Sequence, residues 1–320
     1  MAAIQQPAAL QLADDLWQID TFHQGVPNVI ASYLLTGRSG AALVDVGPGA
    51  TVPRLLAGIE AAGVAPERIE HLVLTHVHLD HAGATGSLLA RMPRARAYVH
   101  HIGAPHLIHP EKLIASASRI YGERMATLWG EVLPVPADRL VELDDGMRLT
   151  VGERELQVLY TPGHAIHHVA FHDARRNVVF AGDVAGVRVP GAGSVRPPTP
   201  PPDLSIEDWE ASIARLEALH PAALYIAHFG ALSDVAPHLA RLRERLRAWA
   251  EVVLAAMRAG EPAEPIAARL ATDLDDVTRT LPPAERAEAF ERVELASNHL
   301  MSAQGFMRYF TKRHPELLAI

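Results

Sequence analysis

Six consecutive residues of this chain carry four side chains of the kinds that bind metal ions. The run His76-Val77-His78-Leu79-Asp80-His81 follows an apolar segment, His71–Thr75, whose composition predicts a β-strand. In an extended chain, residues two apart face the same side, so His76 and His78 can hold one ion while Asp80 and His81 turn toward a second. The spacing therefore predicts a two-ion site made of imidazole and carboxylate groups.

Three other predicted strands run into side chains of the same kinds. Leu156–Tyr160 precedes His164, Val178–Ala181 precedes Asp183, and Leu224–Ala227 precedes His228. A glycine lies beside each of these ligands, and glycine permits the tight turns and close backbone approach that a metal site needs. A lone histidine is more often a surface or hydrogen-bonded core residue. Because α/β sheets place their sites at strand ends, the candidate ligands after all four strands together predict that these strand ends converge on one edge of the fold.

The composition restricts which chemistry this site can use. The chain has no cysteine, which excludes disulfides, thiolate nucleophiles and cysteine-held metals, so any metal must be bound by histidine and carboxylate. The 37 acidic against 29 basic residues give a net charge of −8, which disfavours nucleic acid and anionic membranes as partners. With no long apolar run and no basic start, the sequence predicts a cytoplasmic protein without a membrane segment.

The spacing of apolar residues predicts the strands and helices that must position these side chains. Up to about residue 235, short β-branched runs alternate with helical stretches such as Val52–Ala62 and Ser205–Leu219, the latter opening close to a capping box. Beyond that point the apolar spacing becomes helical, as in Leu239–Met257 and Pro283–Leu300. We therefore expect an α/β metal-binding domain over residues 1–235 and an α-helical domain over 236–320. The segment Val195–Pro202 is a stiff polyproline loop by composition.

The motifs resemble those of the metallo-β-lactamase fold superfamily, on its glyoxalase-II-like dinuclear side. The matching stretches are THVHLDHAG at 75–83, TPGH at 161–164, AGD at 181–183 and AHFG at 227–230, with VDVG at 44–47. The resemblance covers about seventy per cent of the chain. It implies a four-layer αβ/βα sandwich with the metals at one edge of two sheets, followed here by the helical C-terminal domain.

The resemblance also implies a ligand set. His76, His78 and His164 would hold the first ion, Asp80, His81 and His228 the second, and Asp183 would bridge. Asp45 would orient a ligand histidine from behind, although a turn aspartate is an equal alternative. His168 is a candidate for a similar supporting role, with a plain strand residue as the alternative. The absence of a metal-binding cysteine and the presence of Asp183 argue against antibiotic hydrolysis.

The expected activity is hydrolysis of a small ester, thioester or lactone by a metal-bridging hydroxide. Asp80 and Asp183 would accept the released proton. The ligands suit two zinc ions per chain, although iron or manganese fits nearly as well. Tyr121, Trp129 and Arg188 are candidate substrate-pocket residues, with core packing as the competing explanation for the aromatic ones.

Two other functions are compatible with the fold. An iron-dependent, persulfide-type dioxygenase would use one ion and leave Asp80, His81 and His228 without a task. A non-catalytic scaffold would not need the complete ligand set. The substrate is expected to be a small molecule, and apolar faces on the tail helices allow a homodimer.

Overall fold

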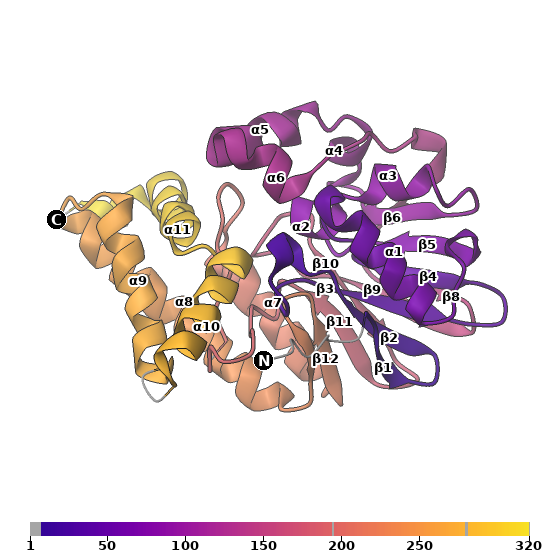
Figure 1. The fold of residues 1–320 in the computed structure, drawn as a ribbon. Helices are drawn as coiled ribbons and strands as arrows, with labels where there is room; N and C mark the ends of the chain where they lie inside the picture. The colour runs from indigo at the N-terminus through magenta and orange to yellow at the C-terminus, as the bar shows by residue number, and fades with distance from the viewer. Residues whose placement is uncertain (1–7, 194, 279–280, 320) are drawn as a thin grey trace. The chain divides into compact units, whose positions relative to one another are not determined.

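The computed structural model describes residues 8–193, 195–278 and 281–319, with the backbone alone for 273–278. The chain divides into two compact units, Met1–Val158 and Leu159–Ile320. The sequence-based division at residue 235 stays a prediction. Two sheets and a set of C-terminal helices are present, so the expected α/β class with a helical C-terminal part is confirmed (Figure 1).

A seven-stranded sheet forms the centre of the first unit, with its strands in chain order. They are β1 (Leu10–Ala13), β2 (Leu16–Asp20), β3 (Ala31–Thr36), β4 (Ala41–Val44), β5 (Ile69–Val73), β6 (Arg96–His100) and β7 (Leu140–Leu143). The strands β1 to β4 pair antiparallel, whereas β4 to β7 run parallel. The carboxyl ends of β4 and β5 therefore meet at one edge, which brings Asp45 beside Thr75 and the histidine-rich run.

Six helices belong to the first unit. They are α1 (Val52–Ala61), α2 (Leu79–Ala82), α3 (Thr85–Leu89), α4 (Ala104–Ile108), α5 (Glu111–Tyr121) and α6 (Met125–Trp129). Leu55 and Ile59 of α1 and Leu88 of α3 pack into one buried cluster with the sheet residues Leu43 and Leu72. This packing holds α1 and α3 against the sheet whose strand β5 precedes the histidine-rich run.

A six-stranded second sheet has the order β13-β12-β11-β10-β9-β8. Its strands are β8 (Arg148–Val151), β9 (Arg154–Tyr160), β10 (Val169–Asp173), β11 (Val178–Gly182), β12 (Ala223–Ile226) and β13 (Gly230–Leu232). Because β11 and β12 are parallel, their carboxyl ends place Asp183 and His228 at the same edge. The division between the two units falls within β9.

The helices of the second unit form one packed group. They are α7 (Ile206–Ala218), α8 (Val235–Arg258), α9 (Ala263–Thr278), α10 (Pro283–Ala296) and α11 (His299–Arg313). The buried residues of α8 recur every three or four positions, and α8 packs against α7, α9 and α11 (Figure 1). The helical pattern of the tail is thus confirmed. Within the described residues, no helix has both the length and the apolar character that crossing a membrane requires.

Some local expectations were wrong. Ser205 precedes α7, but its side chain makes no capping hydrogen bond, and its hydroxyl instead accepts one from Arg313. The strand β10 was missed because polar residues, His172 and Asp173, interrupt its apolar run although both are buried. The sequence analysis does not predict α5 either, for a different reason: only Ala117 of this amphipathic helix is buried, so the helix depends on its tertiary neighbours.

Candidate metal centre

The histidine-rich run turns sharply after β5 and gathers its four polar side chains. His78 is extended and precedes the single turn of α2, which carries Asp80 and His81. The His76 Nε2 and His78 Nδ1 atoms lie 3.0 Å apart, and His81 Nε2 lies 3.7 Å from Asp80 Oδ2. His76 and His81 are fully buried, with ring centroids 4.0 Å apart. The first unit therefore brings together the four predicted ligands that the run supplies.

The Asp45 carboxylate makes hydrogen bonds to Thr75, just before this run, and to His81 within it. Its carboxylate accepts hydrogen bonds from the Thr75 backbone N–H at 2.8 Å and from the Thr75 hydroxyl at 2.8 Å. The same carboxylate lies 2.8 Å from His81 Nδ1. Because an ionised carboxylate only accepts, Nδ1 carries the proton and Nε2 presents its lone pair. A carboxylate that orients an imidazole in this way is a common support for metal ligands. That Asp45 supports a metal ligand stays a prediction.

The second unit brings together the remaining three predicted ligands. His164 Nε2 lies 3.4 Å from Asp183 Oδ2, and His228 Nε2 lies 3.6 Å from Asp183 Oδ1. All three side chains are buried. Asp183 thus faces one histidine with each carboxylate oxygen. A bridging role for Asp183 stays a prediction.

Gly163 permits the close approach that places His164. Its φ of +136° is a conformation that side-chain-bearing residues rarely adopt, and an added Cβ would lie 2.4 Å from the Trp209 Cα. The backbone of the 161–164 turn therefore lies directly against the start of α7. The Ser205 N–H fixes this contact by donating to the Gly163 carbonyl at 2.9 Å.

His168 supports Asp183 through the backbone. Its Nε2 accepts the Asp183 N–H at 3.1 Å, so its Nδ1 carries the proton and donates to the Thr161 hydroxyl at 2.9 Å. His168 is fully buried. The residue therefore links the loop after β9 to the end of β11, consistent with the supporting position that the sequence suggested.

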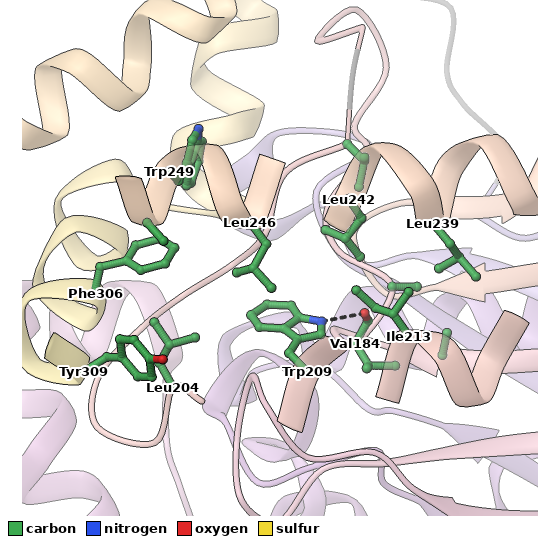
Figure 2. Packing of buried hydrophobic residues seen from close by; sticks show 14 of the residues in the cluster. Val184, Leu204, Trp209, Ile213, Leu239, Leu242, Leu246, Trp249, Phe306 and Tyr309 are labelled. Atoms are coloured by element: carbon green, nitrogen blue, oxygen red, sulfur yellow. Dashed lines mark hydrogen bonds between the residues drawn. The ribbon is translucent and has the colours of Figure 1, made fainter. Parts of the chain in front are cut away.

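Trp209 joins the same two loops, and sequence reasoning missed it. Its indole N–H donates to the Val184 carbonyl at 2.8 Å, one residue beyond Asp183, as the dashed line in Figure 2 marks. Its ring meets the His164 ring edge-on, with centroids 5.8 Å apart. Its only sequence signal was its place on the apolar face of α7, which is equally typical of a core residue.

Two of the three candidate pocket residues lie in a small cluster beside the histidine-rich run. Tyr121 and Trp129 meet edge-on with centroids 5.0 Å apart, and both pack against the cluster that contains Leu79. Burial and the nearby Asp80 carboxylate raise the pKa of Tyr121, so its hydroxyl stays protonated. Trp129 is buried and stacks on His23, as a core residue would.

Arg188, the third candidate, contacts the predicted ligand His228 through its backbone. Its N–H donates to the His228 carbonyl at 2.5 Å, and its guanidinium pairs with Asp234 at 2.7 Å. Burial alone would raise the pKa of Asp234, but the hydrogen bond and charge of Arg188 outweigh that effect and lower it. A substrate contact for any of the three residues stays a prediction.

The predicted ligands form two half-sets, His76, His78, Asp80 and His81 in the first unit and His164, Asp183 and His228 in the second. One histidine in each half-set has the same protonated ring nitrogen. His81 and His164 both carry their proton on Nδ1, toward a protein acceptor, which leaves Nε2 for a metal. The distribution of the seven side chains over two ions stays a prediction.

Comparison with known proteins extends these observations. A family model described as the metallo-beta-lactamase superfamily matches residues 25–228, a range that holds all seven predicted ligands and ends at His228. The described part of the helical tail, α8 to α11, lies beyond the match.

Individual relatives cover much of the chain. The acyl-coenzyme A thioesterase MBLAC2 of Homo sapiens is 27% identical over 58% of this chain and 68% of its own. A hydroxyacylglutathione hydrolase of Cupriavidus taiwanensis is 30% identical over 77% of this chain and 81% of its own. The crystal structure of the metallo-beta-lactamase family protein TTHA1429 from Thermus thermophilus matches with a TM-score of 0.67 at 25% identity, covering 88% of both chains.

Proposed function

The chain belongs to the metallo-β-lactamase superfamily, and on that premise we propose that it is a dinuclear metal-dependent hydrolase of small thioesters. The observation that carries the proposal is the complete set of seven ligand-type side chains, gathered as two half-sets. We assign His76, His78 and His164 to the first ion and Asp80, His81 and His228 to the second. Asp183 bridges the two ions in this assignment.

The donor atoms fit divalent zinc. In a tetrahedral zinc site with bonds of about 2.0–2.2 Å, neighbouring ligand atoms lie roughly 3.3–3.5 Å apart. The His164 Nε2–Asp183 Oδ2 distance of 3.4 Å and the His228 Nε2–Asp183 Oδ1 distance of 3.6 Å are close to that separation. Both exceed the usual length of an N–H···O hydrogen bond. Imidazole and carboxylate also suit iron and manganese, so zinc is the part of the proposal that metal analysis must decide.

Two zinc ions, when bound, would lower the pKa of a water molecule toward neutrality and polarise the scissile carbonyl. The chain's own residues then have two tasks. Asp45 and His168 keep the ligands oriented, His81 through Nδ1 and Asp183 through its backbone N–H. In this proposal, the Asp80 and Asp183 carboxylates would accept the proton released during hydrolysis.

Thioesters are the favoured substrate class among the three that the ligand set allows. The relatives include an acyl-coenzyme A thioesterase and a hydroxyacylglutathione hydrolase, whose substrates are both thioesters. Esters and lactones need the same carbonyl chemistry and are therefore the closest competing classes.

The test combines metal analysis with a substrate panel. Anaerobically purified protein is expected to contain two zinc ions per chain and to hydrolyse an acyl-coenzyme A or acyl-glutathione faster than lactones or phosphodiesters. Asp183→Ala should lower that rate by about a hundredfold or more, because the bridging carboxylate is lost. Asp173→Asn is a matched control, since Asp173 is also a buried aspartate but pairs with Arg176.

Two results would contradict the proposal. A single iron per chain, without thioester hydrolysis, would favour the persulfide-type dioxygenase. Hydrolysis unchanged by Asp183→Ala would show that the assigned bridge does not take part.

A further inference from the structure

The first five residues of the proline-rich segment Val195–Pro202 are buried, whereas a solvent-exposed spacer would not be. Residues 195–199 are buried, and Arg196 forms a two-way backbone pairing with Val187 at 2.8 Å in each direction. Within this segment, the four residues from Pro197 to Pro200 have no regular secondary structure. A buried irregular segment needs a structural reason, because its backbone polar groups must find partners.

One of those backbone groups contacts a predicted metal ligand. His164 Nδ1 lies 2.8 Å from the Pro198 carbonyl oxygen. Because a carbonyl only accepts, Nδ1 must carry the imidazole proton, and Nε2 is left as the atom that faces Asp183 at 3.4 Å. The Pro198 carbonyl therefore selects the tautomer and the ring orientation that metal binding requires.

The other side of this segment lies against α11. A Cβ added at Gly305 would be 1.8 Å from the Thr199 carbonyl oxygen and 3.0 Å from the Pro200 carbonyl carbon. The Thr199 hydroxyl donates to the Ser302 carbonyl at 3.4 Å, one helical turn before Gly305. Glycine at position 305 is thus what allows the helix to lie directly on the segment.

The helix α11 is itself firmly held in the second unit. Phe306 and Tyr309 belong to the buried cluster that contains Trp209, Trp249 and Leu204, and Figure 2 shows their side chains together. Tyr309 also donates from its hydroxyl to the Glu207 carboxylate at 2.6 Å. A displacement of the proline-rich segment therefore cannot be relieved simply by α11 moving away.

We propose that α11, through Gly305, is a positioning element of the metal centre: it sets the proline-rich segment so that the Pro198 carbonyl orients His164. This inference rests on the proposed function, because it gives His164 the role of a ligand. It assigns a task to α11, which lies outside residues 25–228, the range that the family model matches.

The variant Gly305→Ala separates this role from helix stability. Alanine is favoured over glycine in a helix by about 1 kcal/mol, so the substitution by itself should not weaken α11. The new Cβ would, however, push the Thr199 carbonyl away by about an ångström or more, since packed interiors leave no spare room. A shift of that size transmitted to Pro198 would take its carbonyl beyond hydrogen-bonding distance of His164.

The experiment measures metal affinity in the whole 320-residue chain. Metal-free protein is titrated with Zn²⁺ against a chromophoric chelator, and with Co²⁺ to follow the absorption spectrum of the bound ion. We expect wild-type protein to show two binding steps and Gly305→Ala to show one of them weakened by about tenfold to a hundredfold. The Co²⁺ spectrum of that step should change, because its imidazole ligand is no longer held in one orientation.

Trp249→Phe is the matched control. Trp249 lies in the same buried cluster and its ring contacts His299 at the start of α11, with centroids 5.8 Å apart. The substitution should lower the free energy of unfolding while leaving both binding steps unchanged. A loss of affinity in this control equal to that in Gly305→Ala would show that general loosening of the helix is responsible, and would overturn the inference.

A second variant covers the case in which Gly305→Ala does not fold. Thr199→Val removes the hydroxyl that donates to Ser302 and keeps the side-chain shape. It should weaken the same binding step by about threefold, the equivalent of one modest hydrogen bond. Unchanged binding in the folded variants overturns the inference alone, whereas wild-type protein that binds no pair of ions refutes the proposed function.

Discussion

Replacing Asp45 by asparagine removes one charge from the support of His81 and leaves the backbone almost undisturbed. Asp45 has a φ of +52°, a conformation that aspartate and asparagine both tolerate better than most residues. The asparagine amide has one acceptor oxygen. In the wild type, one Asp45 oxygen accepts from the Thr75 N–H at 2.8 Å and the other from His81 Nδ1 at 2.8 Å. Asparagine therefore cannot replace both acceptors.

The size of the effect follows from the contact that is lost. A hydrogen bond to a charged group contributes about 1.5–3 kcal/mol. At 1.36 kcal/mol for each factor of ten, this corresponds to about tenfold to a hundredfold in affinity for the ion that we assign to His81. An amide N–H directed at His81 would also favour the tautomer with its proton on Nε2, which blocks the ligand atom.

The assay is competition titration of the metal-free protein with Zn²⁺. Asp20→Asn is the control, because Asp20 is also a buried aspartate but accepts from the backbone N–H groups of Phe22 and Asn28. Both variants should lose stability, and Asp45→Asn should also lose affinity in one binding step. If Asp45→Asn binds both ions as tightly as wild type, Asp45 is a turn residue and the reasoning about His81 is wrong.

Three further predictions concern the second unit and the metals. Trp209→Phe should lower the free energy of unfolding by about 2–3 kcal/mol in urea titrations, because the Val184 carbonyl loses its donor and the smaller ring leaves a cavity; a change below about 0.5 kcal/mol would contradict this. Burial lowers the pKa of His238 from its ordinary value of 6.5, although its hydrogen bond to the Ala185 carbonyl opposes the shift. The unfolded state therefore binds more protons, and metal-free protein should lose stability as the pH falls below that value, whereas His238→Gln should show a smaller loss. Chelation of the metals should abolish thioester hydrolysis, and added Zn²⁺ should restore it; activity that survives complete metal removal would exclude the proposed chemistry.

The predicted ligands were accessible from the sequence because they depend on local pattern. His76, His78, Asp80 and His81 lie within six residues after a strand, and the other three candidates each follow an apolar run. Strand ends in α/β folds carry sites for a general reason, so their convergence within each unit was predictable. The absence of cysteine limits the ligands to imidazole and carboxylate groups, whatever the fold. The 3.6-residue spacing of apolar side chains also sufficed to predict the C-terminal helices.

Contacts between residues far apart in the chain had no such local signature. The Pro198 carbonyl that meets His164 is 34 residues away, and the hydroxyl of Thr199 meets Ser302 across 103 residues. Backbone carbonyls are identical in every residue, so composition cannot show which one orients an imidazole. Trp209 likewise had the pattern of any buried helix residue, and only the fold places its indole N–H against the Val184 carbonyl.

The sequence by itself determined which atoms can bind metal, because ligand chemistry belongs to each side chain. Only the tertiary structure decided which ring nitrogen of His81 and His164 carries the proton, because that choice depends on an acceptor brought close by folding. The same holds for Gly305, whose missing Cβ matters only because a buried carbonyl lies where that atom would be.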